Sequence, residues 1–114
     1  MNDEDGSMVK FMILFRPPAD LEAFENSYND FLALVERMPA IERRQVINVL
    51  GSPRGPAPYY RILEVYFESY AVLDSALKST AGQEAGGQLA TLPPGSFELI
   101  FAEVFEEMGG STPR

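Results

Sequence analysis

The sequence predicts an α+β domain in which strands and helical regions follow one another in the order β-α-β-β-α-β. Three observations support this: short apolar runs without helix breakers, stretches with apolar residues three and four apart, and turns rich in Pro and Gly between them. A chain of 114 residues fits one such domain, because a single core is normal at this length. With 46% hydrophobic residues, the chain can bury that core.

The first strand and the first helix are predicted before residue 39. The run MVKFMILF, residues 8–15, is apolar and is followed by Pro17 and Pro18, as expected of a buried strand. Asp20 can cap a helix that ends by Pro39. Its apolar residues recur at spacings of three and four and form one stripe: Leu21, Phe24, Tyr28, Phe31, Val35 and Met38.

A hairpin across a long loop is predicted next. Residues 41–51, IERRQVINVLG, mix polar residues with Val and Ile and predict a second strand. The loop SPRGPAP at 52–58 is dense in Pro and Gly. Residues 59–67, YYRILEVYF, are aromatic and β-branched and predict a third strand.

The last part of the chain predicts helical structure and a closing strand. Ser69 can cap a helix through residues 70–79, and residues 80–92 predict a second helical piece weakened by glycine. The PPG turn at 93–95 ends it, and residues 96–107, SFELIFAEVFEE, alternate as a fourth strand.

This order of elements is that of the ferredoxin-like fold, a four-stranded antiparallel sheet with its helices on one face. The domain is expected to span residues 8–107. Residues 1–7, MNDEDGS, are expected to be a disordered acidic tail, because they offer nothing to bury, and residues 108–114 a flexible C-terminal tail.

Charge and missing residue types narrow the function classes. A net charge of −8 disfavours nucleic acid and anionic membranes as partners, because phosphate groups need concentrated Lys and Arg. Because the chain has no Cys and no His, Ser-His-Asp and Cys-His catalysis are excluded. The side chains that most often bind transition metals are missing as well, so we expect no metal site and no cofactor. No apolar run approaches the roughly 20 residues of a membrane span. A cytoplasmic location is the default expectation.

Both faces of the predicted sheet are apolar. In the first strand Phe11, Ile13 and Phe15 alternate with Met12 and Leu14. In the fourth strand, one set of apolar residues opposes another: Ile100, Ala102 and Val104 against Phe97, Leu99 and Phe101. Helices on one face leave the other uncovered, and soluble monomers rarely expose so large an apolar patch. We therefore expect a homodimer paired sheet to sheet; the alternative is a cover made by the tails or the second helical piece.

The sequence resembles the EthD family of the dimeric α+β barrel superfamily. Four segments carry the resemblance: VKFMILFRPPADLEAFENSY at 9–28, MPAI at 38–41, YYRILEVYFESYAVLDSALKSTAGQE at 59–84 and FAEVFEE at 101–107. The resemblance implies a homodimer whose sheets close into a barrel around a pocket, with the helices outside. Many relatives carry a histidine that would fall here at Phe31 or Leu32, so chemistry that uses this imidazole is not implied for this chain.

Glu64 is the best candidate for chemistry, because its carboxylate lies on a strand among apolar neighbours. If it faces the barrel, desolvation favours a role as general base or proton acceptor. The alternative is an ion pair with Arg43, Arg44 or Arg61. Strand alternation places three further side chains on the surface of Glu64, where they would line a ligand pocket: Tyr60, Ile62 and Tyr66.

Three other residues are weaker candidates for ligand binding. Arg44 and Asn48 on the second strand are expected in the pocket or at its rim, and Tyr28 is expected in the core with its hydroxyl reaching the surface. The leading functional hypothesis is a homodimer that binds a small apolar or aromatic molecule in its barrel and acts in the degradation or processing of such a compound. The alternatives are a cofactor-independent oxygenase, isomerase or cyclase that uses Glu64, and a dimeric interaction or stress protein with a filled barrel.

Overall fold

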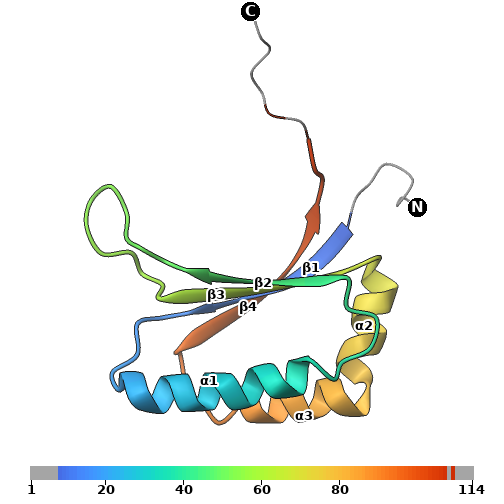
Figure 1. The fold of residues 1–114 in the computed structure, drawn as a ribbon, viewed down its shortest axis with the longest axis horizontal. Helices are drawn as coiled ribbons and strands as arrows, with labels where there is room; N and C mark the ends of the chain where they lie inside the picture. The colour runs from blue at the N-terminus through green and yellow to red at the C-terminus, as the bar shows by residue number, and fades with distance from the viewer. Residues whose placement is uncertain (1–7, 108, 110–114) are drawn as a thin grey trace, which may run out of the picture.

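The computed structural model describes residues 8–107 and residue 109, so both expected tails, 1–7 and 108–114, fall outside the described residues apart from Gly109. The elements are β1 (Met8–Phe15), α1 (Leu21–Val35), β2 (Arg43–Asn48), β3 (Arg61–Phe67), α2 (Tyr70–Lys78), α3 (Thr80–Leu89) and β4 (Phe97–Val104). The strands form one antiparallel sheet in the order β2-β3-β1-β4, and the helices lie on one side of it (Figure 1). The predicted ferredoxin-like α+β fold is confirmed.

β1 and α1 form where the sequence predicts them. The Asp20 side chain accepts a hydrogen bond from the backbone N–H of Ala23 at 3.1 Å, so it caps α1 as expected. The helix ends at Val35, before the last residue of the predicted stripe. Met38 is nevertheless buried, in the turn that follows.

β2 and β3 are shorter than the predicted strands. Their register runs from Arg43 opposite Tyr66 to Asn48 opposite Arg61, and residues 49–60 form the connecting loop. In Figure 1 this loop rises on the side of the sheet that faces away from the helices.

Two serines start the last two helices. The hydroxyl oxygen of Ser69 accepts a hydrogen bond from the N–H of Val72 at 3.2 Å, and that of Ser79 accepts one from the N–H of Gly82 at 3.0 Å. Ser79 alone separates α2 from α3. The predicted glycine-weakened piece is therefore a separate helix, α3, and it packs on the same side of the sheet as α1.

The core lies between the sheet and the helices. Phe15 is 1% exposed, and its ring lies 5.4 Å from that of Phe24, 5.5 Å from that of Tyr28 and 6.4 Å from that of Phe97. Most side chains of β1 and β3 that point toward the helices are buried, which accounts for one of the two apolar faces. Within residues 8–107, no helix has both the length and the apolar character needed to cross a membrane.

Candidate functional site

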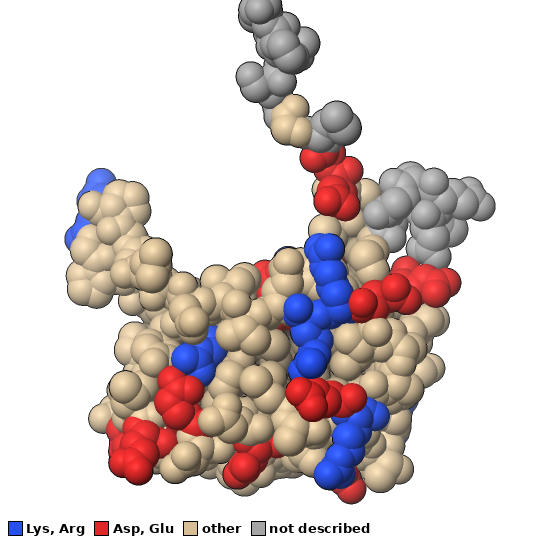
Figure 2. Space-filling view, in the orientation of Figure 1, with Lys and Arg blue, Asp and Glu red and all other residues tan. Residues whose placement is uncertain are grey.

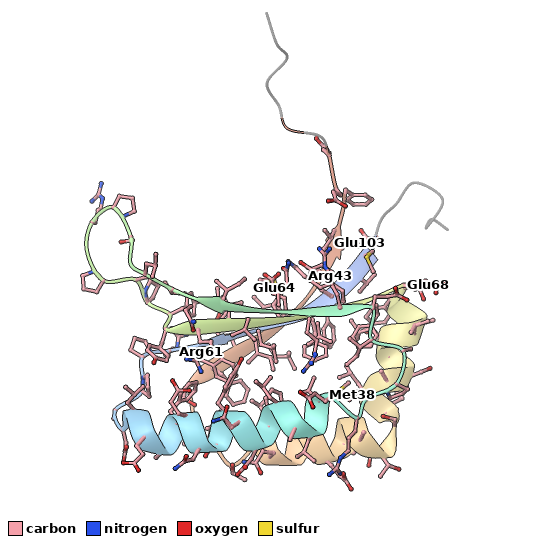
Figure 3. All side chains as sticks on the ribbon, viewed as in Figure 1. Met38, Arg43, Arg61, Glu64, Glu68 and Glu103 are labelled. Carbon is pink, nitrogen blue, oxygen red and sulfur yellow. The ribbon has the colours of Figure 1, made fainter. Side chains whose placement is uncertain are left out.

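The sheet face away from the helices is the candidate site, and we call it the open face. Strand register assigns these side chains to it: Met8, Lys10, Met12 and Leu14 of β1; Arg43, Gln45 and Ile47 of β2; Ile62, Glu64 and Tyr66 of β3; Glu98, Ile100, Ala102 and Val104 of β4. No helix within the described residues covers this face (Figure 1). In Figure 3, Glu64 and Arg43 lie on the open side of the sheet, whereas Arg61 and Met38 lie on the helix side.

A polar cluster sits in the middle of this largely apolar face. The ammonium group of Lys10 lies 3.1 Å from Oε1 of Glu64, and the hydroxyl of Tyr66 donates to the same oxygen at 2.9 Å. Within the single chain, Glu64 is only 7% exposed and Tyr66 only 4%. A carboxylate buried to this degree must be paired, and here Lys10 and Tyr66 pair it.

Two cations flank the ring of Tyr66. The guanidinium of Arg43 lies 4.2 Å from the ring centroid, and the ammonium of Lys10 lies 5.3 Å from it. The hydroxyl of Tyr66 also lies 3.2 Å from Oε1 of Gln45. The open face therefore offers a carboxylate, a phenol and two positive charges within an apolar surround, enough to orient a ligand that has one polar end.

The predicted ion-pair partner of Glu64 was of the right kind but was the wrong residue. Glu64 pairs with Lys10 of β1, not with Arg43, Arg44 or Arg61. Arg43 stacks on Tyr66 instead, while Arg44 and Arg61 point toward the helices. Lys10 lies two residues before Met12 on the first strand, so both side chains are on the same face, and this spacing could have identified Lys10 as a neighbour of Glu64.

The predicted surface shared by Tyr60 and Glu64 is wrong. The hydroxyl of Tyr60 donates to Glu25 of α1 at 3.1 Å, and its ring packs edge-on against Phe24 at 5.7 Å. Tyr60 precedes β3, which begins at Arg61, so the strand alternation does not extend to it. Ile62, Glu64 and Tyr66 do share the open face, as predicted.

Arg44, Asn48 and Tyr28 also lie on the helix side, so the open face does not contain them. Arg44 contacts Glu36 at 3.5 Å, and Oδ1 of Asn48 accepts a hydrogen bond from Arg61 at 2.9 Å. The expected surface position of the Tyr28 hydroxyl is wrong, because the residue is 3% exposed and its hydroxyl is buried without a hydrogen-bond partner. Burial raises the pKa of the Tyr28 phenol above its ordinary value.

Glu25 joins the helix layer to the sheet through Arg61. Arg61 donates to both carboxylate oxygens of Glu25, at 2.8 Å and 2.9 Å. These hydrogen bonds lower the pKa of Glu25 below its ordinary value of 4.5, more than partial burial raises it. The same bonds raise the pKa of Arg61.

The Glu25–Arg61 pair predicts a dependence of stability on pH. A carboxyl group whose pKa is lowered by folding stabilises the fold at pH values above its pKa in the unfolded chain. This contribution is lost as the pH falls through the pKa of the group in the folded protein. Because Glu25 is about one third exposed, we expect Glu25→Gln to lower the free energy of unfolding by only about 1 kcal/mol near neutral pH. Urea unfolding should show this difference shrinking below about pH 4. Glu84→Gln, in an exposed pair with Arg37, is the control; an equal and pH-independent effect of both substitutions would contradict the prediction.

The described residues contain no group of three or more acidic side chains placed to hold a metal ion. On the open face, Lys10 and Tyr66 both lie within hydrogen-bond distance of the Glu64 carboxylate. The role of Glu64 as a proton acceptor stays a prediction.

Comparison with known proteins gives a consistent picture. No family model matches the sequence. An uncharacterised 11.0 kDa protein from the thcB-thcC intergenic region of Rhodococcus erythropolis is 28% identical over 97 residues, which cover 84% of this chain and 94% of that protein.

Solved structures extend the likeness to the fold. An EthD family protein from Bacillus halodurans has a TM-score of 0.80 and 27% identity, over 89% of this chain and 99% of that one. A dimeric ferredoxin-like protein of unknown function from a Jannaschia species has a TM-score of 0.68 and 17% identity, over 85% and 99% of the two chains. The chain therefore resembles an EthD family protein in sequence and in structure, and its ferredoxin-like α+β fold is confirmed.

Proposed function

We propose that the protein is a homodimer that binds a small, mostly apolar molecule between two sheets paired through their open faces. The main observation in support of this proposal is that the open face is a largely apolar surface with the Lys10–Glu64–Tyr66 cluster at its centre. Ile100 is 42% exposed on this face, so a partner surface can contact this large apolar side chain. A second copy of the sheet presents the same apolar surface and can cover it through two-fold symmetry.

The two edges of the sheet support this pairing. β2 forms one edge and carries Arg43 and Arg44 but no acidic residue, whereas β4 forms the other and carries Glu98 and Glu103 but no basic residue. If β4 of each copy lies beside β2 of the other, opposite charges face one another and both exposed edges are closed. The paired sheets then enclose the polar cluster of each copy in a barrel.

The polar cluster supports ligand binding in this barrel. Ligand sites are mostly apolar and contain a few polar groups that fix orientation. Here Glu64 accepts hydrogen bonds, while Lys10 and Arg43 provide positive charge beside the ring of Tyr66. A small aromatic molecule with one hydroxyl group fits this set, because its ring can pack on apolar side chains such as Ile62 while its hydroxyl donates to the carboxylate.

A titration with 2-naphthol tests the proposal. We expect the probe to shift the backbone amide NMR signals of open-face residues such as Met12, Ile62 and Ile100. Glu64→Gln should weaken the binding about tenfold, which corresponds to roughly 1.4 kcal/mol, because the ligand loses a charged acceptor.

The matched control is Glu103→Gln, at a strand glutamate whose register places it on the opposite side of the sheet. This substitution should leave the dissociation constant unchanged. The proposal fails if 2-naphthol shifts no open-face signal, or if both substitutions have the same effect on binding. Circular dichroism of each variant confirms that the comparison is made on folded protein.

A further inference from the structure

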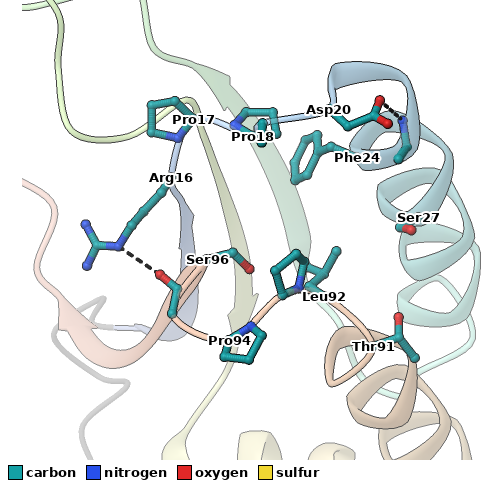
Figure 4. A pocket seen from close by; sticks show the side chains of 14 residues that line it. Arg16, Pro17, Pro18, Asp20, Phe24, Ser27, Thr91, Leu92, Pro94 and Ser96 are labelled. Atoms are coloured by element: carbon teal, nitrogen blue, oxygen red, sulfur yellow. Dashed lines mark hydrogen bonds between the residues drawn. The ribbon is translucent and has the colours of Figure 1, made fainter.

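A cavity lies at one end of the molecule, away from the open face. It has a volume of about 520 Å³, is partly open to solvent, and is bounded by the turn that leads into α1, the first turns of α1 and the segment that leads into β4 (Figure 4). No open-face side chain belongs to its lining. Its volume falls within the range of small-molecule sites, about 300–1,000 Å³.

The walls of this cavity are apolar and stiff. They are built mainly from four prolines and two larger side chains: Pro17, Pro18, Pro93, Pro94, Phe24 and Leu92. The proline ring fixes the backbone angle φ, so these turns lose little further freedom when a ligand binds. Ring faces of proline and phenylalanine suit a flat aromatic ligand.

The charged residues in the lining already have partners within the protein. Arg16 forms an ion pair with Glu98 and donates from Nε to the carbonyl oxygen of Gly95 at 3.1 Å. Asp20 caps α1 through the N–H of Ala23. Neither charge is left to hold an ion of opposite sign, which favours a neutral ligand.

One buried side-chain hydroxyl in the lining has no hydrogen-bond partner among the described residues. The hydroxyl oxygen of Ser96 is buried and makes no hydrogen bond. By contrast, the hydroxyl of Thr91 donates to the carbonyl oxygen of Gln88 at 2.6 Å. Figure 4 shows the Ser96 side chain in the cavity lining, with its hydroxyl turned toward Leu92. Because buried polar groups in proteins are nearly always paired, a ligand in the cavity would supply the missing partner once the Ser96 side chain rotates toward it.

We propose that this cavity is a separate binding site for a small neutral aromatic molecule that carries one hydroxyl or carbonyl oxygen, with that oxygen paired to Ser96. A cavity of about 150 Å³ accommodates benzene, so the larger volume here admits a two-ring compound. The site does not depend on the homodimer or on the barrel, because a single chain supplies every residue that lines it.

Three naphthalene compounds test the chemistry of this site. We expect 2-naphthol to bind and to shift the amide signals of Ala23, Ser27, Thr91 and Ser96. Naphthalene, which lacks the oxygen, should bind about tenfold more weakly, and 2-naphthoate should bind more weakly still, because the cavity offers no unpaired cation. Ser96→Ala should abolish the preference for 2-naphthol over naphthalene.

Substitutions at two alanines of α1 test the location of the binding site. Ala23 lines the cavity, whereas Ala33 is an exposed residue of the same helix and does not. Ala23→Trp should fill the cavity and weaken 2-naphthol binding at least tenfold, while Ala33→Trp should leave it unchanged. Ala23→Leu, a smaller filling substitution, repeats the test if the tryptophan variant does not fold.

The open face and the cavity can be tested apart with the same probe. Glu64→Gln should leave the shifts at Ala23 and Ser96 intact, and Ala23→Trp should leave those at Met12 and Ile100 intact. Shifts confined to the open face would overturn the cavity site and leave the homodimer proposal standing. The cavity site would also be overturned if the two tryptophan variants bound 2-naphthol equally well, or if 2-naphthol shifted none of the amide signals of the cavity residues.

Discussion

Gly82→Ala is expected to lower the free energy of unfolding by about 3 kcal/mol, the upper end of what overpacking costs. Gly82 is buried where α3 meets the end of α2. A β-carbon at this position would lie under 3.0 Å from the carbonyl oxygens of Ala76 and Leu77. Because both contacts are with backbone, relief requires the two helices to separate.

Gly86→Ala is the matched control in the same helix. A β-carbon at Gly86 meets nothing within 4 Å, so alanine should stabilise α3 by about 0.5–1 kcal/mol through its higher helix propensity. Urea unfolding of the two variants measures both effects. Effects of the same sign would contradict the close packing of α2 against α3.

Ile100→Asp is expected to weaken the proposed homodimer at least about a hundredfold. Ile100 lies opposite Met12 on the open face, where pairing of the sheets would bury it. An unpaired carboxylate buried in an interface typically costs about 3–5 kcal/mol. Two-fold symmetry places the substitution on both copies, so the effect occurs twice in each dimer.

Leu21→Asp controls for the change in charge and hydrophobicity. Leu21 is 52% exposed at the start of α1, on the helix side of the molecule. Analytical ultracentrifugation across a range of concentrations should show dissociation for Ile100→Asp only. A dimer that survives Ile100→Asp unchanged would place the interface elsewhere.

Patterns of local origin were predictable from the sequence. Alternation in β1 and spacing in α1 follow directly from the geometry of strand and helix, and the caps at Asp20 and Ser69 follow from side chains next to the residues that they cap. The sequence also placed Ile62, Glu64 and Tyr66 together, because they alternate within one continuous strand.

The features that the sequence did not reveal depend on contacts between distant segments. Tyr60 and Arg61 both reach Glu25 because the strand begins between them, a boundary that alternation alone does not set. Lys10 meets Glu64 only through the register of β1 against β3. The cavity at one end of the molecule is lined by two proline-containing turns that lie more than 70 residues apart in the sequence, so no single sequence motif predicts it.

The mass of the protein in solution tests the central claim most directly. At micromolar concentration, size-exclusion chromatography with light scattering should give about twice the 12.7 kDa of one chain, because a second copy covers each open face. A species of 12.7 kDa would contradict the account and remove the barrel and its ligand site with it.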